Sequence, residues 1–365
     1  MKTKKNISKC MKVSLAFIVP LILSCSCQKD DPLISDDQPL VKSEDTLRNY
    51  SPEVSFEITD HLLEGKAITC IEPNYKGNTW VASGKELYYV NDSLEKTYTL
   101  NYPILDISVA GDSTLWIATQ GGGLGHLSGN EVTWFNRANS NLPRDSIWNV
   151  EVGSDGRVWF SSVGLNHGGL FAYDGKKFKL FTPDNSILSQ HIISDIGIDR
   201  NGSIYVISSS GKVGGFKVYK ITDGLWECLG NHNETFYSVY KFAVGPAGIV
   251  FFVVDYTLSS SSFSQNIICE FRDNNWHKLE ADFMSLQISG FAPINADRRN
   301  YCWIASKEDD SDILHVYNGI SWEKSPKGLF QGDKITTIEV DIDNNIWVGT
   351  SQNGIFVLKQ ERSAL

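Results

Sequence analysis

The sequence lacks a hydrophobic run long enough for a comfortable transmembrane helix. Its apolar run near the start, Val13–Leu23, is too short to cross a bilayer. The seven histidines are scattered, and no two of them have a metal-ligand spacing. The cysteines beyond residue 30 show no CxxC spacing, which argues against a zinc site or a disulfide framework. They are Cys70, Cys228, Cys269 and Cys302.

Motifs of the common enzyme classes are absent too. The sequence holds no nucleophile elbow, no pair of histidines at a metal-binding spacing and no Gly-rich phosphate loop. We therefore predict no catalytic residue, no metal site and no cofactor. Whether the protein is an enzyme stays open, because residues far apart in a chain can still assemble a site.

An excess of basic residues is also missing. The net charge is -10, and the first 24 residues hold five lysines and no acid, so the remainder is more acidic still. An acidic body cannot neutralise phosphates, nor is it attracted to an anionic membrane surface. The charge therefore argues against nucleic acid as a partner.

The N-terminus has the pattern of a processing signal, in which lysines precede the apolar run. The run ends at Cys25 and Cys27, each preceded by a serine. This resembles a lipobox, where a small residue precedes a cysteine that receives diacylglycerol and becomes the mature N-terminus. Cys25 has the better residue three places before it, Ile22. Cys27 is followed by Gln28–Asp31, which resembles the acidic export tag of Bacteroidetes surface lipoproteins.

These features divide the chain into three predicted segments. Residues 1–26 form a lipoprotein signal peptide, and Cys27 (or Cys25) is the lipidated residue. Residues 27–52 form a disordered acidic tether, since their acids lie among Pro, Ser and Gln and cannot bury enough apolar surface to offset the entropy of ordering. Residues 53–365 form the folded domain. We expect an outer membrane lipoprotein, with the periplasmic or the extracellular face left open.

An internal repeat dominates residues 53–365. A short alternating strand, such as Ile192–Ile198 or Ile335–Val340, precedes a polar turn and then an aromatic residue among small or branched ones. The aromatic residues follow one another at spacings of 36, 43, 46, 46, 52 and 44 residues, which suit one four-stranded blade each. They are Trp80, Trp116, Trp159, Tyr205, Phe251, Trp303 and Trp347.

The fourth strand of each repeat also carries an aromatic residue at a fixed place. Large aromatics provide the flat apolar area that neighbouring blades need. In six repeats they are Tyr98, Trp134, Phe178, Trp226, Trp276 and Trp322. The seventh repeat stops after three strands, and Val54–Glu57, with Phe56 in the aromatic position, supplies the fourth. The sequence thus predicts an all-β protein, a seven-bladed β-propeller whose last blade is closed by an N-terminal strand.

The repeat resembles a known family. Ile335–Leu358, which reads ITTIEVDIDNNIWVGTSQNGIFVL, and Gln120–Leu124 are similar to the two-component-regulator propeller repeat of Bacteroidetes. In that family the propellers usually form the periplasmic sensor half of a hybrid histidine kinase. The sequence contains no kinase or DNA-binding segment, so we expect that it does not signal by phosphotransfer itself.

Propellers usually bind ligands where their loops surround one mouth of the central channel. Trp148 is the one tryptophan that the repeat does not require, and its position predicts a platform for a sugar or an aromatic ligand; simple plugging of the channel is the other interpretation. Asn166, His167 and Tyr237 lie in loops or strand starts on the same face. We predict a ligand site around these four residues.

Three hypotheses of function follow, by analogy with other propellers. The favoured one is a membrane-anchored lipoprotein that binds a glycan, a peptide or an outer-membrane protein partner without transforming it. The second is a lyase or hydrolase with a site at the channel mouth. The third is an architectural subunit of an outer-membrane complex.

Overall fold

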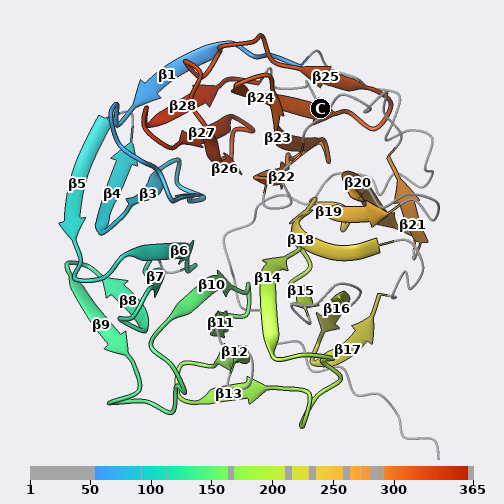
Figure 1. The fold of residues 1–365 in the computed structure, drawn as a ribbon. Helices are drawn as coiled ribbons and strands as arrows, with labels where there is room; N and C mark the ends of the chain where they lie inside the picture. The colour runs from blue at the N-terminus through green and yellow to red at the C-terminus, as the bar shows by residue number, and fades with distance from the viewer. Residues whose placement is uncertain are drawn as a thin grey trace, which may run out of the picture. The chain divides into compact units, whose positions relative to one another are not determined.

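The computed structural model describes residues 54–360 apart from 92, 112, 163–167, 210–215, 230–235, 258–263, 274, 280–287 and 289–291. The described residues form seven antiparallel sheets of four strands each, arranged in a ring (Figure 1). The prediction of an all-β, seven-bladed propeller is therefore confirmed. No helix among these residues is long and apolar enough to cross a membrane.

In each blade the strands follow one another outward from the centre (Figure 1). The inner strands are β2 (Cys70–Pro73), β6 (Ile104–Val109), β10 (Ile147–Val152), β14 (Ile192–Ile198), β18 (Phe236–Val244), β22 (Ile294–Ala296) and β26 (Ile335–Val340). The second strands are β3 (Thr79–Ser83), β7 (Leu115–Thr119), β11 (Val158–Ser162), β15 (Ile204–Ser209), β19 (Val250–Thr257), β23 (Cys302–Glu308) and β27 (Ile346–Thr350).

The outer half of each blade is built in the same way. The third strands are β4 (Glu86–Asn91), β8 (Leu124–Ser128), β12 (Gly169–Tyr173), β16 (Phe216–Thr222), β20 (Ser264–Arg272), β24 (Ser311–Tyr317) and β28 (Ile355–Leu358). The outer strands are β5 (Ser93–Thr99), β9 (Glu131–Phe135), β13 (Phe178–Phe181), β17 (Leu225–Cys228), β21 (Asn275–Lys278), β25 (Trp322–Lys324) and β1 (Ile58–Leu62).

The aromatic residues that the repeat predicted for the second strands occupy equivalent places. Each is the second residue of its strand, from Trp80 in β3 to Trp347 in β27. The buried apolar side chains gather in seven clusters, and each cluster joins two neighbouring blades. Trp303, for example, is fully buried between blades six and seven. The core thus lies between the sheets, and each blade is held by its neighbours.

The ring is closed by pairing the two ends of the described chain. Strand β1 pairs with β28 in antiparallel register, from Ile58 opposite Leu358 to Leu62 opposite Ile355. The prediction that Val54–Glu57 forms this strand was wrong by four residues, since the pairing with β28 begins at Ile58. Residues 54–57 belong to no strand, and they are joined to the chain after β28 by single hydrogen bonds such as that of 3.3 Å from the Lys359 N–H to the Glu57 carbonyl. Phe56 instead packs edge-on against Trp303, with ring centroids 5.9 Å apart.

Aspartates at the turns between first and second strands hold those turns together. Asp341 Oδ1 accepts hydrogen bonds from the backbone N–H groups of Asp343 and Asn345, and Asp341 Oδ2 accepts one from Trp347 Nε1 at 3.0 Å. Asp199 and Asp297 bind the turn and the aromatic residue of their own blades in the same way. The Asp- and Asn-rich turns are therefore structural elements of the repeat.

Candidate functional site

The inner strands of the seven blades surround a central channel (Figure 1). Each inner strand runs from the link that enters its blade to the turn before the second strand. The starts of these strands therefore gather at one mouth of the channel and their ends at the other. An inner strand is also a sheet edge, so its channel-side N–H groups need partners other than a strand.

Side chains from the preceding blade satisfy several of these edge N–H groups. The acceptors are carboxylates or a hydroxyl on the neighbouring inner strand, at distances of 2.9–3.2 Å. The bonds run from Val109 to Glu72, from Val150 to Asp106, from Val152 to Ser108 and from Phe242 to Asp195. Polar residues inside apolar strands are therefore explained in part by the free edge that the ring leaves at its centre.

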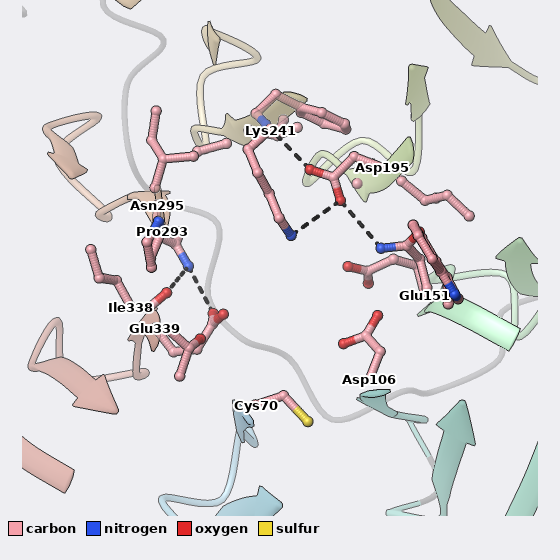
Figure 2. A pocket seen from close by; sticks show the side chains of 18 of the residues that line it. Cys70, Asp106, Glu151, Asp195, Lys241, Pro293, Asn295, Ile338 and Glu339 are labelled. Atoms are coloured by element: carbon pink, nitrogen blue, oxygen red, sulfur yellow. Dashed lines mark hydrogen bonds and ion pairs between the residues drawn. The ribbon is translucent and has the colours of Figure 1, made fainter. Parts of the chain in front are cut away.

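The channel contains a hollow of about 330 Å³ whose charged lining is mainly acidic. Four acids line it from four different blades: Asp106, Glu151, Asp195 and Glu339. Among the described residues of the lining, Lys241 is the one cation. Figure 2 shows the side chains of these residues converging on the hollow, together with the thiol of Cys70. Glu72 on β2 is outside this lining, but its charge raises the pKa of Glu151 and Glu339.

The carboxylates differ in how far their charge is balanced. Asp195 has Lys241 Nζ at 3.7 Å and accepts a hydrogen bond of 3.4 Å from Asn149. Glu339 accepts one of 2.7 Å from Asn295. Glu151 has no hydrogen bond or ion pair through its side chain with any described residue. Its half-buried carboxylate is therefore the group of this hollow with the least compensation.

Enclosure raises the pKa of the channel carboxyls, because it removes water that would stabilise their charged forms. This effect raises the pKa of Glu72 to about 8 and that of Asp106 to about 7, against the hydrogen bonds from Val109 and Val150. Burial, followed by the negative charges of the neighbouring carboxylates, also raises the pKa of Glu151 and Glu339. The pKa of Lys241 is raised chiefly by the charge of Asp195.

Trp148 is the predicted site residue that the structure describes in full. It is the second residue of β10, lines the channel hollow and leaves 48% of its surface exposed. It lies near the start of its strand, hence near the mouth at which the blade links gather. An exposed indole at the entrance to a polar channel is suited to stacking on a flat ligand group. Its role in binding remains a prediction.

The other predicted ligand residues are less fully described. Asn166 and His167 lie outside the described residues. Tyr237 belongs to strand β18, but its side chain is outside the described part of the structure. Of the four residues, Trp148 is thus the one whose surroundings can be stated.

The sequence analysis missed the channel carboxylates. A signal was present, since Asp106 and Asp195 each interrupt an apolar strand two residues after a buried isoleucine, Ile104 or Ile193. In one strand such an acid looks like an ordinary solvent-facing residue. It can be recognised as part of an acidic cluster only when the ring brings it beside the acids of other blades.

The opposite mouth of the channel has a different character. A second hollow, also of about 330 Å³, lies among the turns that follow the inner strands and shares Asn295 and Glu339 with the first. The arginines Arg200 and Arg298 line it together with the exposed Tyr75. The channel therefore has an acidic middle, a tryptophan at one mouth and two guanidinium groups at the other.

Within the described residues, no set of three or more His, Cys, Asp or Glu side chains is placed to hold a metal ion. The cysteines of the body are free, and Cys228 is exposed whereas Cys70, Cys269 and Cys302 are buried.

Comparison with known proteins bears on the fold and the repeat. Residues 329–352 match the sequence model of the family described as "Two component regulator propeller". No curated protein sequence matches the chain.

Several solved structures resemble the propeller. YCF48 bound to D1 peptide is 15% identical, with a TM-score of 0.61 over 85% of this chain and 99% of that one. Virginiamycin B lyase from Staphylococcus aureus is 13% identical, with a TM-score of 0.63 over 84% and 99%. The third structure is the extracellular domain of BT4673, a putative hybrid two component system from B. thetaiotaomicron. It is 16% identical, with a TM-score of 0.60, and the match covers 85% of this chain but only 40% of that one.

At these identities the likeness shows the fold alone, because one propeller fold serves both binding proteins and enzymes. The repeat match, which covers the link into the seventh blade and its first two strands, is independent of that likeness. Both findings confirm the resemblance predicted from the sequence: the chain is a seven-bladed β-propeller that carries a two component regulator propeller repeat.

Proposed function

We propose that this protein is a lipid-anchored binding protein whose propeller holds a peptide segment at its central channel without transforming it. The observation that carries the proposal is the acidic hollow, and within it the uncompensated carboxylate of Glu151. A lysine or arginine side chain of the peptide would enter from the mouth near Trp148. The peptide-bound state of YCF48, which has the same fold, supports this choice.

Electrostatics favours a cationic group over a neutral one in this hollow. The lining carboxylates raise one another's pKa, which means that each costs free energy to ionise while the others are charged. A cation bound among the carboxyls lowers the free energy of ionising them. Binding should then release protons, and affinity should rise from about pH 5 to about pH 8 as the carboxyls ionise.

Trp148 favours a second candidate, a glycan. Its exposed indole would stack on a sugar ring, and a neutral sugar would gain little from the carboxylates. The two candidates therefore differ in which residue matters most: Glu151 for a basic peptide and Trp148 for a glycan.

A binding screen on residues 28–365 separates the candidates. Basic, acidic and neutral peptides and a panel of polysaccharides are tested by calorimetry against wild type, Glu151→Gln, Trp148→Ala and the control Glu131→Gln. Glu131 is an exposed carboxylate on the outer strand β9. We expect basic peptides to bind and to lose about tenfold in affinity in Glu151→Gln, with Glu131→Gln unchanged. Glycan binding that only Trp148→Ala abolishes would replace the peptide proposal, and no binding at all would favour the architectural role.

The anchor and the location of the protein form a separate part of the proposal. The lipobox-like pattern at Cys25 and Cys27 supports an outer membrane lipoprotein, and extracellular domains with the same fold support an extracytoplasmic location. The mass of the mature N-terminus tests this, since lipidation at Cys27 would survive in Cys25→Ala and disappear in Cys27→Ala. An unlipidated N-terminus in the wild type would contradict it.

The enzyme hypothesis is tested by the same screen. The fold is shared with virginiamycin B lyase, which makes a lyase worth testing even though the likeness shows the fold alone. Each ligand that binds is recovered and weighed by mass spectrometry. An unchanged mass supports simple binding, whereas a cleaved or rearranged ligand would establish catalysis.

A further inference from the structure

A larger hollow lies beside the channel, between blades six and seven. Its volume is about 560 Å³, which is within the usual range of about 300–1,000 Å³ for small-ligand sites. It is lined by the hairpin of β23 and β24, by the link Gly332–Lys334 and by the start of the loop after β27, at Ser351 and Gln352. Pro293 and Thr336 line both this hollow and the channel. The two hollows therefore adjoin.

Two of the three aspartates that line this hollow are already engaged. Asp333 accepts hydrogen bonds from the Ser351 hydroxyl and from the N–H groups of Gln352 and Asn353. These bonds outweigh burial and lower its pKa. Asp312 accepts one of 2.9 Å from the Ile335 N–H. Asp310 is exposed and makes no such bond with a described residue.

Two lysines of the same region form ion pairs and two do not. Lys324 binds Glu308 at 3.0 Å, and Lys327 binds Asp309. Lys307 and Lys334, which line the hollow, are exposed and form no ion pair with any described residue. Glu308 and Asp309 are thus paired with lysines that do not line the hollow. Lys307 and Lys334 are the cations of the lining itself. Burial raises the pKa of Asp312 and the charges of these two lysines lower it, but neither ammonium group forms an ion pair with a described carboxylate.

Thr336 adds a polar group at the junction of the two hollows. Its hydroxyl is shielded from solvent and has no hydrogen-bond partner in the described part of the chain. A buried hydroxyl without a partner is unfavourable, so this position favours a polar ligand group. A polar ligand group that crosses from the channel to the adjacent hollow passes this position.

We propose that the hollow between blades six and seven is a second subsite, which binds a carboxylate of the same peptide through Lys307 and Lys334. The inference rests on the proposed function, because the basic side chain in the channel fixes where the peptide begins. The peptide backbone crosses over Pro293 and Thr336, and its C-terminal carboxylate or an acidic side chain lies between the two ammonium groups. The site therefore selects peptides in which a basic residue is followed closely by a negative charge.

Matched synthetic peptides test the subsite. Each N-acetylated probe carries one lysine a few residues before its C-terminus and is made both as the free acid and as the amide. Affinities are measured by calorimetry for wild type, the double variant Lys307→Gln/Lys334→Gln and the control Lys324→Gln. We expect the free acid to bind wild type about tenfold more tightly than the amide. This preference should disappear in the double variant and remain in Lys324→Gln.

The outcomes separate the subsite from the proposed function. Equal affinity of acid and amide for wild type, with binding still weakened by Glu151→Gln, would reject the subsite and leave the channel proposal standing. A preference for the free acid that survives in the double variant would place the carboxylate elsewhere and also reject the subsite. Failure of both peptide forms to bind wild type would overturn both proposals.

Discussion

The second strands and the inner strands of the blades differ in how uniform their residues are at one paired position. At the second residue of each second strand stands the same kind of residue, a Trp, Tyr or Phe. Directly opposite these aromatics, the inner strands carry residues that differ from blade to blade: Glu72, Ser108, Glu151, Gly197, Ala243, Asn295 and Glu339. The aromatic residue on the second strand packs neighbouring blades together. Five of the variable residues line the channel hollow; they are Glu151, Gly197, Ala243, Asn295 and Glu339.

This comparison teaches where to look for function in a repeat protein. Positions that must pack against an identical neighbour are held to one chemistry by the core. Positions on the channel are free of that demand, so they can carry charge. Substitutions in the first class should therefore change stability alone, whereas those in the second should change binding and the dependence of stability on pH.

The largest expected effect is the loss of a second-strand aromatic. Trp303→Ala removes a fully buried indole from the cluster between blades six and seven and should cost about 3–5 kcal/mol in the free energy of unfolding. Trp148→Ala, at the half-exposed channel position, should change it by no more than about 0.5 kcal/mol. Urea unfolding of both variants measures the difference. Similar losses in the two would remove the distinction between packing and channel positions.

A buried histidine on a third strand should make the stability of the protein depend on pH. His315 on β24 is 5% exposed and bonds Ser306 through Nδ1 at 3.0 Å; burial lowers its pKa to about 4. The unfolded chain, with a histidine pKa near 6.5, binds the proton first, so stability should fall as pH drops from about 6.5 to about 4. The loss due to this group is about 3 kcal/mol.

The variant His315→Gln isolates this contribution. Its stability relative to wild type should improve across the same pH window, since glutamine takes up no proton. Unfolding curves at several pH values give the comparison. A difference between variant and wild type that does not change with pH would show that His315 does not titrate as described.

The channel carboxyls should make stability depend on pH in the opposite direction to His315. Because burial raises the pKa of Asp106 to about 7, the folded state keeps a proton that the unfolded chain loses near pH 4. This contribution to stability is complete below about pH 4 and is lost as pH rises through about 7. Asp106→Asn keeps an acceptor for the Val150 N–H and should gain about 4 kcal/mol relative to wild type between pH 4 and pH 8.

Thermal unfolding of this pair across pH provides the measurement. Glu131→Gln, on the outer strand, is the matched control and should show no such trend. If Asp106→Asn followed wild type at every pH, the carboxyl would be ionised throughout, and the pH dependence proposed for ligand binding would lose its basis.

The smallest expected effect concerns the seam where the ring closes. Gln360 donates a hydrogen bond of 2.7 Å to the Ser55 carbonyl and accepts one of 3.2 Å from the Ser55 N–H. Gln360→Ala should cost about 1 kcal/mol. Hydrogen exchange should place the loss in β1 and β28 and leave the second strands protected. Exchange that rises equally in all blades would mean that the seam and the blades open together.

The prediction of the fold succeeded because its signal is local and repeated. Aromatics such as Trp116 and Trp159 recur at blade-length spacings, and turns such as Asp223-Gly224 adopt the positive φ that their sequence suggests. The closing strand was displaced by four residues because Phe56 satisfied the same aromatic pattern. The register of the strand depends on its partner, because β28 pairs with Ile58–Leu62.

The sequence by itself determined the architecture: seven repeats, the aromatic that each contributes and the closure by a segment far away in the chain. It also singled out Trp148 as the tryptophan without a place in the repeat. Only the tertiary structure decided which polar residues meet, since Glu151, Glu339 and Lys241 belong to different blades and become neighbours across the channel. The physical reason is that packing periodicity is written within each repeat, whereas a charged site at the axis arises from the closure of the ring.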